Sequence, residues 1–437
     1  MWQIGASRRN RGVLGVLVAL GFLLSGCGPS APAGSNSASP PKAAPAGSSA
    51  PAASASAASA PASSSAPAAT GDPIRIGVPL SLTGTFAATG KQQLAAINVA
   101  LRDMGNQVAN RPVEIVQIDD EGTPEAALRV TRRLVERDNV DVIIGYSSSA
   151  VGYATRDFLH EVKKPTISVA AAAGLTRENK SPYIWRIMFS NFQFGYEPAK
   201  YLRDKVGAKR IIFWGADYAA PREGYRAVKE VYGDGIVREI WTPLNTMDYA
   251  PYVASIRPGE ADFVTIAAWG ADGARITEQY HRAGLTMPVY GWGSFTSEDV
   301  LPGFSPEAVN GVQSSNIYCS SLDTPANREF VAKFKEQHGD LPGAHAYLSY
   351  LGTRLIGKAI EMVNGDVSNP DRLVEALGKA RLDDMPTGSQ SFDANQALVA
   401  DFFWLKVELE NGKPVNRCVD RIPQVKDPVQ EFPVAAP

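Results

Sequence analysis

Three consecutive serines, Ser147, Ser148 and Ser149, are the residues of this chain whose type and spacing suggest chemistry most directly. They follow a short apolar run, 140–145, which is typical of a strand buried on both faces of a parallel sheet. After them the apolar residues take helical spacing over 151–159. Hydroxyl groups at this point lie beside free backbone N–H groups at the positive end of a helix dipole. The pattern predicts a site for an anion or a carboxylate, and the structural alternative is one capping serine with two solvated neighbours.

Catalysis is not expected from the same residues. The turn occupies the place of a hydrolase nucleophile elbow, but it lacks the second glycine of G-x-S-x-G, which lets a serine occupy the sharp turn. The four histidines fit no metal-binding spacing and are expected mostly on helix surfaces: His160, His281, His338 and His345. The sequence has no glycine loop that could cradle phosphates. We therefore expect a protein that is not an enzyme, with no metal and no cofactor.

The first 27 residues predict an export signal. Three arginines between positions 8 and 11 precede an apolar run, 13–24, which has the length of a secretory signal rather than of a membrane span. The run ends in Leu24-Ser25-Gly26-Cys27, which resembles the lipobox of bacterial lipoproteins, where the signal is cut before a cysteine that is then lipidated. We expect the Sec route and a periplasmic or extracytoplasmic protein that a lipid on Cys27 anchors to a bacterial membrane.

Composition separates a linker from the folded part. Residues 28–71 consist mainly of Ala, Pro, Ser and Gly, so they cannot bury a core and are predicted to be a disordered linker. The remaining residues, 72–437, have the length of two domains. A hydrophobic content of 44% and a net charge of −2 are typical of a soluble globular protein, and no basic patch indicates nucleic acid. After Cys27 only Cys319 and Cys418 remain, and a bridge between them is possible in an oxidising compartment.

Strand and helix patterns alternate twice along this part of the chain. Strands are predicted at 74–80, 113–118, 140–145 and 166–170, with helices between them. This order predicts a parallel sheet covered by helices on both faces. After a crossing segment, 181–191, the alternation restarts with a helix at 196–205 and strands at 210–214, 237–242, 262–267 and 288–291. A second crossing at 312–318, three helices and a late hairpin at Asn411-Gly412 complete the chain.

Several of these segments resemble the leucine/isoleucine/valine-binding protein family, the type I periplasmic solute-binding proteins of ABC importers. The resemblance is carried by IRIGVPLSLTGTFAATGKQQLAAINVALRDMG, VEIVQIDDEGTPEAA, VDVIIGYSSS, ISVAAAAGLT and DFVTIAAW, and it extends over the chain after the linker. It implies an α/β fold of two Rossmann-like lobes with parallel sheets, joined by a three-segment hinge, with the ligand between them. The N-terminal lobe would comprise 72–190 and 317–396, and the C-terminal lobe 191–316 and 397–437.

The resemblance also implies ligand-binding residues. The carboxylate of a ligand should meet Ser148 or Ser149 and the backbone around Ala170 and Ala172, beyond the carboxyl ends of the strands. The other residues expected to touch ligand are Thr89, Tyr146, Asn191, Tyr218, Trp269, Trp292 and Gly293.

Two positions depart from the amino-acid binders of the family. Where those proteins place an acidic residue against the ammonium of the ligand, this chain has Gly293, and Ala172 stands where many have threonine. A buried ammonium without a counter-charge is costly. The expected solute is therefore a small carboxylate, either a branched-chain amino acid or a related aromatic acid or amide.

The expected role is capture of that solute by hinge closure and delivery to a permease and ATPase complex, with the binding protein as a monomer. A receptor or co-receptor of the same fold is the alternative. The family resemblance implies that Cys319 and Cys418 both lie near the hinge. This favours a disulfide between them over two buried free thiols.

Overall fold

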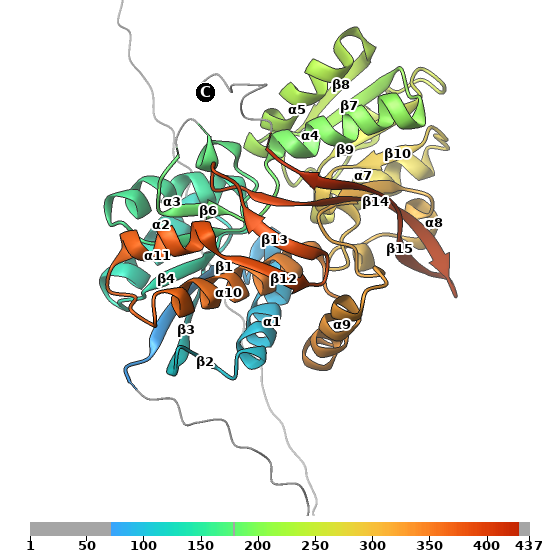
Figure 1. Cartoon of the computed structure of the whole chain (residues 1–437). Coiled ribbons are helices and arrows are strands. Elements are labelled where there is room, and N and C mark those ends of the chain that lie inside the picture. Colours follow the sequence, from blue (N-terminus) through green and yellow to red (C-terminus); the bar gives the residue numbers. More distant parts are fainter. Residues whose placement is uncertain (1–70, 178–179, 428–437) are drawn as a thin grey trace, which may run out of the picture. The chain divides into compact units, whose positions relative to one another are not determined.

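The computed structural model describes residues 71–177 and 180–427. The predicted signal with Cys27, and the predicted linker as far as residue 70, lie outside the described residues. The first of two sheets includes the strands labelled β1, β2, β3, β4 and β6 in Figure 1. Its strand order is β2-β3-β1-β4-β5-β6, and all pairs but β2–β3 are parallel. Its strands are β1 (Ile74–Leu80), β2 (Gln107–Val108), β3 (Arg111–Asp119), β4 (Val142–Gly145), β5 (Thr166–Ser168) and β6 (Ile184–Arg186).

Helices cover both faces of the first sheet, as the apolar run in β4 predicts. Val142 and Ile144 belong to the core cluster that includes α1 and α10, whereas Ile143 belongs to a second cluster with α2 and α3. The side chains of a strand alternate between faces, so a strand that is apolar on both sides must lie between two layers. The helices of this lobe are α1 (Ala87–Asp103), α2 (Pro124–Glu136), α3 (Ser149–Glu161), α9 (Pro325–His338), α10 (Ala344–Met362) and α11 (Pro370–Lys379).

The second sheet is mixed. Its order is β12-β13-β14-β11-β10-β9-β7-β8, with β15 paired to β14. The five neighbouring strands β11, β10, β9, β7 and β8 are parallel to one another. Strand β14 runs antiparallel to β11, β13 and β15. The bounds are β7 (Ile211–Ala216), β8 (Ile236–Thr242), β9 (Phe263–Ala267), β10 (Val289–Gly291), β11 (Gln313–Asn316), β12 (Arg381–Met385), β13 (Gly388–Phe392), β14 (Leu398–Glu410) and β15 (Lys413–Val425).

This sheet also packs helices on both faces. Phe213 of β7 joins the cluster that contains residues of α4 and α5, and its neighbour Trp214 joins the cluster with α6 and α7. The helices are α4 (Asn191–Tyr201), α5 (Ala219–Tyr232), α6 (Ala250–Val253), α7 (Gly270–Arg282) and α8 (Pro306–Val309). The predicted fold class, two α/β lobes with largely parallel sheets, is confirmed.

Two details differ from or extend the sequence-based prediction. The helix expected at 196–205 begins at Asn191, because Ser190 and Gln193 form a reciprocal capping box there. The late hairpin turns at Asn411 and Gly412, both with positive φ as a two-residue hairpin requires, and its arms are longer than predicted. Beside it, Cys319 and Cys418 form a disulfide that closes a sequence separation of 99 residues.

Candidate functional site

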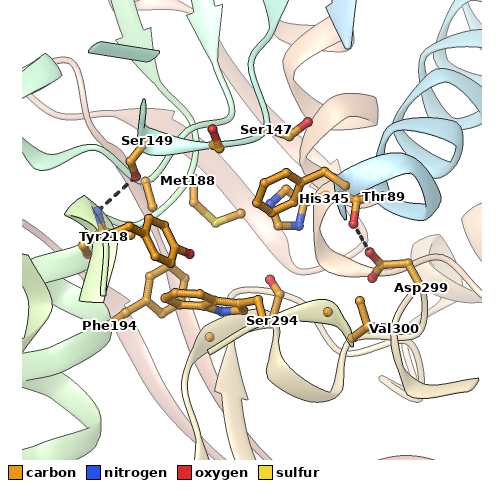
Figure 2. A pocket seen from close by; sticks show the side chains of 18 residues that line it. Thr89, Ser147, Ser149, Met188, Phe194, Tyr218, Ser294, Asp299, Val300 and His345 are labelled. Carbon is orange, nitrogen blue, oxygen red and sulfur yellow. Dashed lines mark hydrogen bonds between the residues drawn. The ribbon is translucent and has the colours of Figure 1, made fainter. Parts of the chain in front are cut away.

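A pocket lies at the carboxyl ends of the parallel strands of both sheets, where the loops lead into helices (Figure 2). It encloses about 710 Å³ of empty space, including space open to solvent. The pocket is lined by Phe86, Thr89, Ser147, Ser148, Ser149, Ala171, Met188, Asn191, Phe194, Tyr218, Ala220, Trp269, Gly270, Gly293, Ser294, Asp299, Val300 and His345.

The predicted serine cluster forms one end of this pocket. Ser148 is the N-cap of α3, and its Oγ accepts a hydrogen bond from the N–H of Val151 at 3.4 Å. The Oγ of Ser149 accepts from Nδ2 of Asn191 at 3.1 Å. In both bonds the serine oxygen is the acceptor, so each O–H group can donate to a ligand. Together with the first-turn N–H groups of α3, these hydroxyls can hold a carboxylate.

Ser147 faces a different partner. Its Oγ donates to Oε1 of Gln93 at 2.6 Å, and Gln93 is fully buried in α1. This bond ties the serine turn to α1. Ser147 thus holds the turn in place, although it also lines the pocket.

Asn191 links the two lobes at the serine end. Its Nδ2 donates to Ser149 and, at 2.7 Å, to Oε2 of Glu223 in α5. Glu223 also accepts from the backbone N–H of Ala173 at 3.3 Å and from the hydroxyl of Tyr153. One carboxylate of the second lobe is therefore bonded to three groups that lie beside or within the first lobe.

Aromatic rings form the wall on the side of the second lobe. The rings of Tyr218 and Trp269 meet edge to face, with centroids 6.0 Å apart. Nε1 of Trp269 donates to the backbone carbonyl of Trp292 at 3.0 Å, which fixes the indole. Burial, and to a lesser degree the charge of Asp272, raises the pKa of Tyr218, so its phenol stays neutral. These rings offer an apolar surface for stacking.

Acidic and imidazole groups form the other end of the pocket, away from Ser149 and Tyr218 (Figure 2). Oγ1 of Thr89 donates to Oδ2 of Asp299 at 2.5 Å. Burial lowers the pKa of His345, against the opposing field of Asp299, so the imidazole is neutral near pH 7. No lysine or arginine is among the lining residues.

Helix N-termini surround the cavity. Lining residues belong to the first turns of α1, α3, α4, α5, α7 and α10. The first N–H groups of a helix have no partner within the helix and give its start a partial positive charge. Some of these groups are bonded here, among them the N–H of Asn191 to Ala171 and that of Ala344 to Ser297. The pocket therefore attracts an anion without any basic side chain.

The structure brings most of the predicted residues together. The seven that line the pocket are Thr89, Ser148, Ser149, Asn191, Tyr218, Trp269 and Gly293. Four predicted residues do not line it, namely Tyr146, Ala170, Ala172 and Trp292. The side chains of Ala170 and Ala172 are fully buried in the α2–α3 cluster, and Ala171, in the same stretch of backbone, lines the pocket.

Backbone and packing account for the positions of the two aromatic residues that do not line the pocket. Tyr146 has a φ of 65°, and its buried hydroxyl lies 2.9 Å from Oγ1 of Thr131 in α2. Its ring thus packs in the core of the first lobe. Trp292 packs edge to face on Phe213, and a Cβ added to Gly224 would lie only 2.3 Å from its ring. Its indole therefore fills the contact between α5 and the second sheet.

Sequence reasoning missed the acidic end of the pocket. Asp299 lies in a loop after β10, and His345 is in the first turn of α10, far from Thr89 in sequence. His345 is partly exposed on α10, and its Nδ1 is buried. No spacing or motif connects these residues. Ser147 and Ser294 are different, because each is next to a predicted residue in the sequence. The same strand-end turns could therefore have predicted them as lining residues.

The described part of the chain contains neither a cluster of metal ligands nor a helix that could span a membrane. Within residues 71–177 and 180–427, no group of three or more His, Cys, Asp or Glu side chains could hold a metal ion. Over the same residues, no helix has the length and apolar character needed to cross a membrane.

Comparisons with known proteins agree with this architecture. A family model described as "Periplasmic binding protein" matches residues 73–413. The Leu/Ile/Val-binding protein homolog 6 of Brucella melitensis is 27% identical over 79% of this chain and 90% of its own length. An ABC transporter substrate-binding protein from Sphaerobacter thermophilus is 35% identical, with a TM-score of 0.75, over 80% of this chain and 98% of that one.

A third relative has a bound ligand. It is the solute-binding protein of an ABC transporter from R. palustris, solved in complex with benzoate, and it is 26% identical with a TM-score of 0.75. The alignment covers 82% of this chain and 98% of that one. Because the family model spans well over half of the sequence, this chain belongs to the periplasmic binding proteins, in their type I leucine/isoleucine/valine-binding family, and is a binding protein rather than an enzyme.

Proposed function

We propose that this chain is the solute-binding component of an ABC importer and that it captures a small aromatic carboxylate. The observation that carries the proposal is the convergence of six helix N-termini on a pocket without lysine or arginine. Such ends bind anions through N–H groups and the helix dipole. Ser148 and Ser149 add two hydroxyl donors at one of these ends.

The walls of the pocket favour an aromatic ring over an aliphatic chain. Phe86, Phe194, Tyr218 and Trp269 all line it. A ring between them can stack edge to face or offset, which contributes about 0.5–1.5 kcal/mol beyond the burial of its area. The R. palustris relative in complex with benzoate supports this ligand class.

A branched-chain amino acid is the second candidate, because the Brucella relatives carry the name of Leu/Ile/Val-binding proteins. The charges in the pocket oppose it. Asp299 is the one carboxylate among the lining residues, and it lies at the end remote from Ser149 (Figure 2). In an α-amino acid the ammonium is on the carbon next to the carboxylate, so it cannot reach Asp299 while the carboxylate is at α3. An unpaired buried ammonium costs several kcal/mol.

Delivery and location complete the proposal. The lobes close on the solute, and the closed form docks on a permease that an ATPase drives. Relatives named as substrate-binding or solute-binding proteins of ABC transporters support this role. The lipobox-like segment at Cys27 supports a lipid anchor outside the cytoplasm.

A thermal-shift measurement on the full chain tests the ligand class. Benzoate at 100 times its dissociation constant should stabilise the fold by about 2.7 kcal/mol, which raises the melting temperature by a few degrees. Leucine should give no shift, and benzamide, which lacks the charge, should give a smaller one than benzoate. A shift with leucine and none with benzoate would refute the proposal and identify an amino-acid binder.

A further inference from the structure

The last two described residues carry the chain from the second lobe back to the first. Strand β15 belongs to the second sheet and ends at Val425. Two residues later, Oδ1 of Asp427 accepts a hydrogen bond from Nη2 of Arg177, which follows the short helix Ala173–Thr176. Its Oδ2 accepts from Nη2 of Arg186, in β6, at 2.5 Å. Both arginines belong to the first lobe, so this part of the chain adds a link between the lobes to the three that the family resemblance implies.

The three charged side chains of this link are buried. The exposed fraction is 1% for the side chain of Arg177 and 0% for those of Arg186 and Asp427. Burial lowers the pKa of the Arg186 guanidinium, and the charge of Asp427 opposes that shift. A buried charge is costly unless it is paired and hydrogen-bonded. Asp427 is therefore the counter-charge that allows the two arginines to be buried together.

Arg186 lies where the chain first crosses between the lobes. The chain leaves β6 at Arg186 and enters α4 at Asn191. Within this crossing, Nη1 of Arg186 donates to the backbone carbonyl of Met188. The backbone N–H of Arg186 donates to the carbonyl of Gln396 at 2.9 Å, at the expected boundary between the lobes. Arg186 thus joins two crossings, and Asp427 is bonded to the same side chain.

Arg177 reaches the second lobe through a further contact. Its Cζ lies over the ring of Phe192, in the first turn of α4, at 4.7 Å from the ring centroid. A buried guanidinium is attracted to the face of an aromatic ring. Arg177 therefore contacts two residues of the second lobe, Phe192 and Asp427, and a rotation that opens the lobes moves it away from both.

We propose that Arg177 and Arg186 form a carboxylate site that Asp427 fills, and that the filled site holds the two lobes in the closed arrangement. The segment after β15 is then a fourth link of the hinge. A buried ion pair alone is weak evidence for stability, because packed apolar residues often replace it without loss. Its particular property is geometric, since a guanidinium bonds a carboxylate in a fixed planar arrangement. Without the carboxylate, two buried cations remain side by side, and separation of the lobes lets water reach them.

Asp427→Asn tests the inference in the full chain, because it keeps the size of the side chain and removes its charge. Small-angle scattering without added solute should show a larger radius of gyration than for the unmodified chain. The dissociation constant of benzoate, measured by calorimetric titration, should rise at least tenfold, because binding must then also close the lobes. An unchanged radius of gyration in the folded Asp427→Asn protein would overturn the inference.

Asp420 provides the matched control on the same strand. Its carboxylate accepts from Tyr201 at 2.8 Å and from Lys205 at 3.3 Å, and both partners belong to the second lobe. Asp420→Asn should therefore change neither the radius of gyration nor the affinity. An equal change in the two variants would show a loss of charge on β15 rather than a link between the lobes, and would also overturn the inference.

A second variant decides the question if Asp427→Asn does not fold. Arg177→Gln leaves the neutral pair of Arg186 and Asp427 in place and removes the contacts of Arg177 with Phe192 and Asp427. It should likewise enlarge the radius of gyration, and an unchanged value would overturn the inference. If benzoate did not bind the unmodified chain, the proposed function would fail, while the scattering comparison would still decide the role of Asp427.

Discussion

Ser148 serves the fold and the proposed site at once. Its oxygen caps α3, and the residue lines the pocket, where its O–H group is free to donate to a ligand. Ser148→Ala should lower the free energy of unfolding by about 1 kcal/mol through loss of the cap. It should also weaken binding of the aromatic acid about tenfold or more, since a hydrogen bond to a charged group contributes about 1.5–3 kcal/mol. Urea unfolding and calorimetric titration measure the two effects.

A second capping residue provides the control. Thr123 caps α2 in the same way, through a bond from the N–H of Ala126 at 3.3 Å, and it does not line the pocket. Thr123→Ala should cost similar stability and leave the affinity unchanged. Equal affinity loss in the two variants would show that Ser148 acts only through stability, against the account given above.

Residue placement shows where reasoning from sequence stops. The serines were predictable because a buried strand followed by a helix puts them at the helix N-terminus. Tyr146 is only two residues before Ser148, yet its positive φ directs the ring into the core. No pattern of residues in the sequence predicts this positive φ at Tyr146. Asp299 was missed because its partner Thr89 is 210 residues away, and the contact exists only in the folded chain.

At the scale of elements, α5 holds the lobes together through Glu223. Its carboxylate accepts from Asn191, from the N–H of Ala173 and from Tyr153. Glu223→Ala should destabilise the closed arrangement because these donors lose their acceptor there and can bind water when the lobes open. We expect about a tenfold or greater loss of affinity and a larger radius of gyration by small-angle scattering.

Glu230 on the same helix is the matched control. It is exposed, so Glu230→Ala should change neither the affinity nor the scattering. Unchanged affinity in Glu223→Ala would mean that its bonds contribute nothing to closure.

Elements with strong apolar patterns were predictable, and those defined by tertiary contact were not. β4 and β7 lie between helical layers, so their sequences are continuously apolar. The start of α4 was placed five residues late, although Ser190 and Gln193 provide a capping-box signal that could have found it. β12 and β13 are short, partly exposed strands at the edge of the second sheet, and they have no such pattern.

At the scale of the whole molecule, stability should depend on pH through Glu298. Burial raises its pKa to about 7 from an ordinary value of 4.5, despite bonds from Ser320 and Asn416. A raised folded-state pKa stabilises the protonated native form, and this contribution is lost as the pH rises from about 4.5 to 7. Its upper limit is about 3 kcal/mol. Glu298→Gln should therefore match the unmodified protein near pH 4.5 and be more stable above pH 7.

Denaturant unfolding at several pH values measures this difference. Glu307→Gln removes an exposed carboxylate in α8 and should follow the unmodified chain throughout. The prediction fails if the Glu298→Gln protein shows the same pH dependence as the unmodified protein.

The overall architecture, two α/β lobes with largely parallel sheets, was predictable because repeated strand–helix alternation allows few topologies. Its binding chemistry was predictable only in part. The strand-end rule places a site between the lobes, and the serines predict an anion. The acidic end depends on a loop and a helix start that converge only in the folded protein.

The most direct test of the central claim is a crystal structure of the full chain with benzoate. We predict the ring between Tyr218 and Phe194, with the carboxylate oxygens within hydrogen-bond distance of Ser148, Ser149 and the first-turn N–H groups of α3. A carboxylate seated at Asp299, or benzoate bound outside this pocket, would contradict the account.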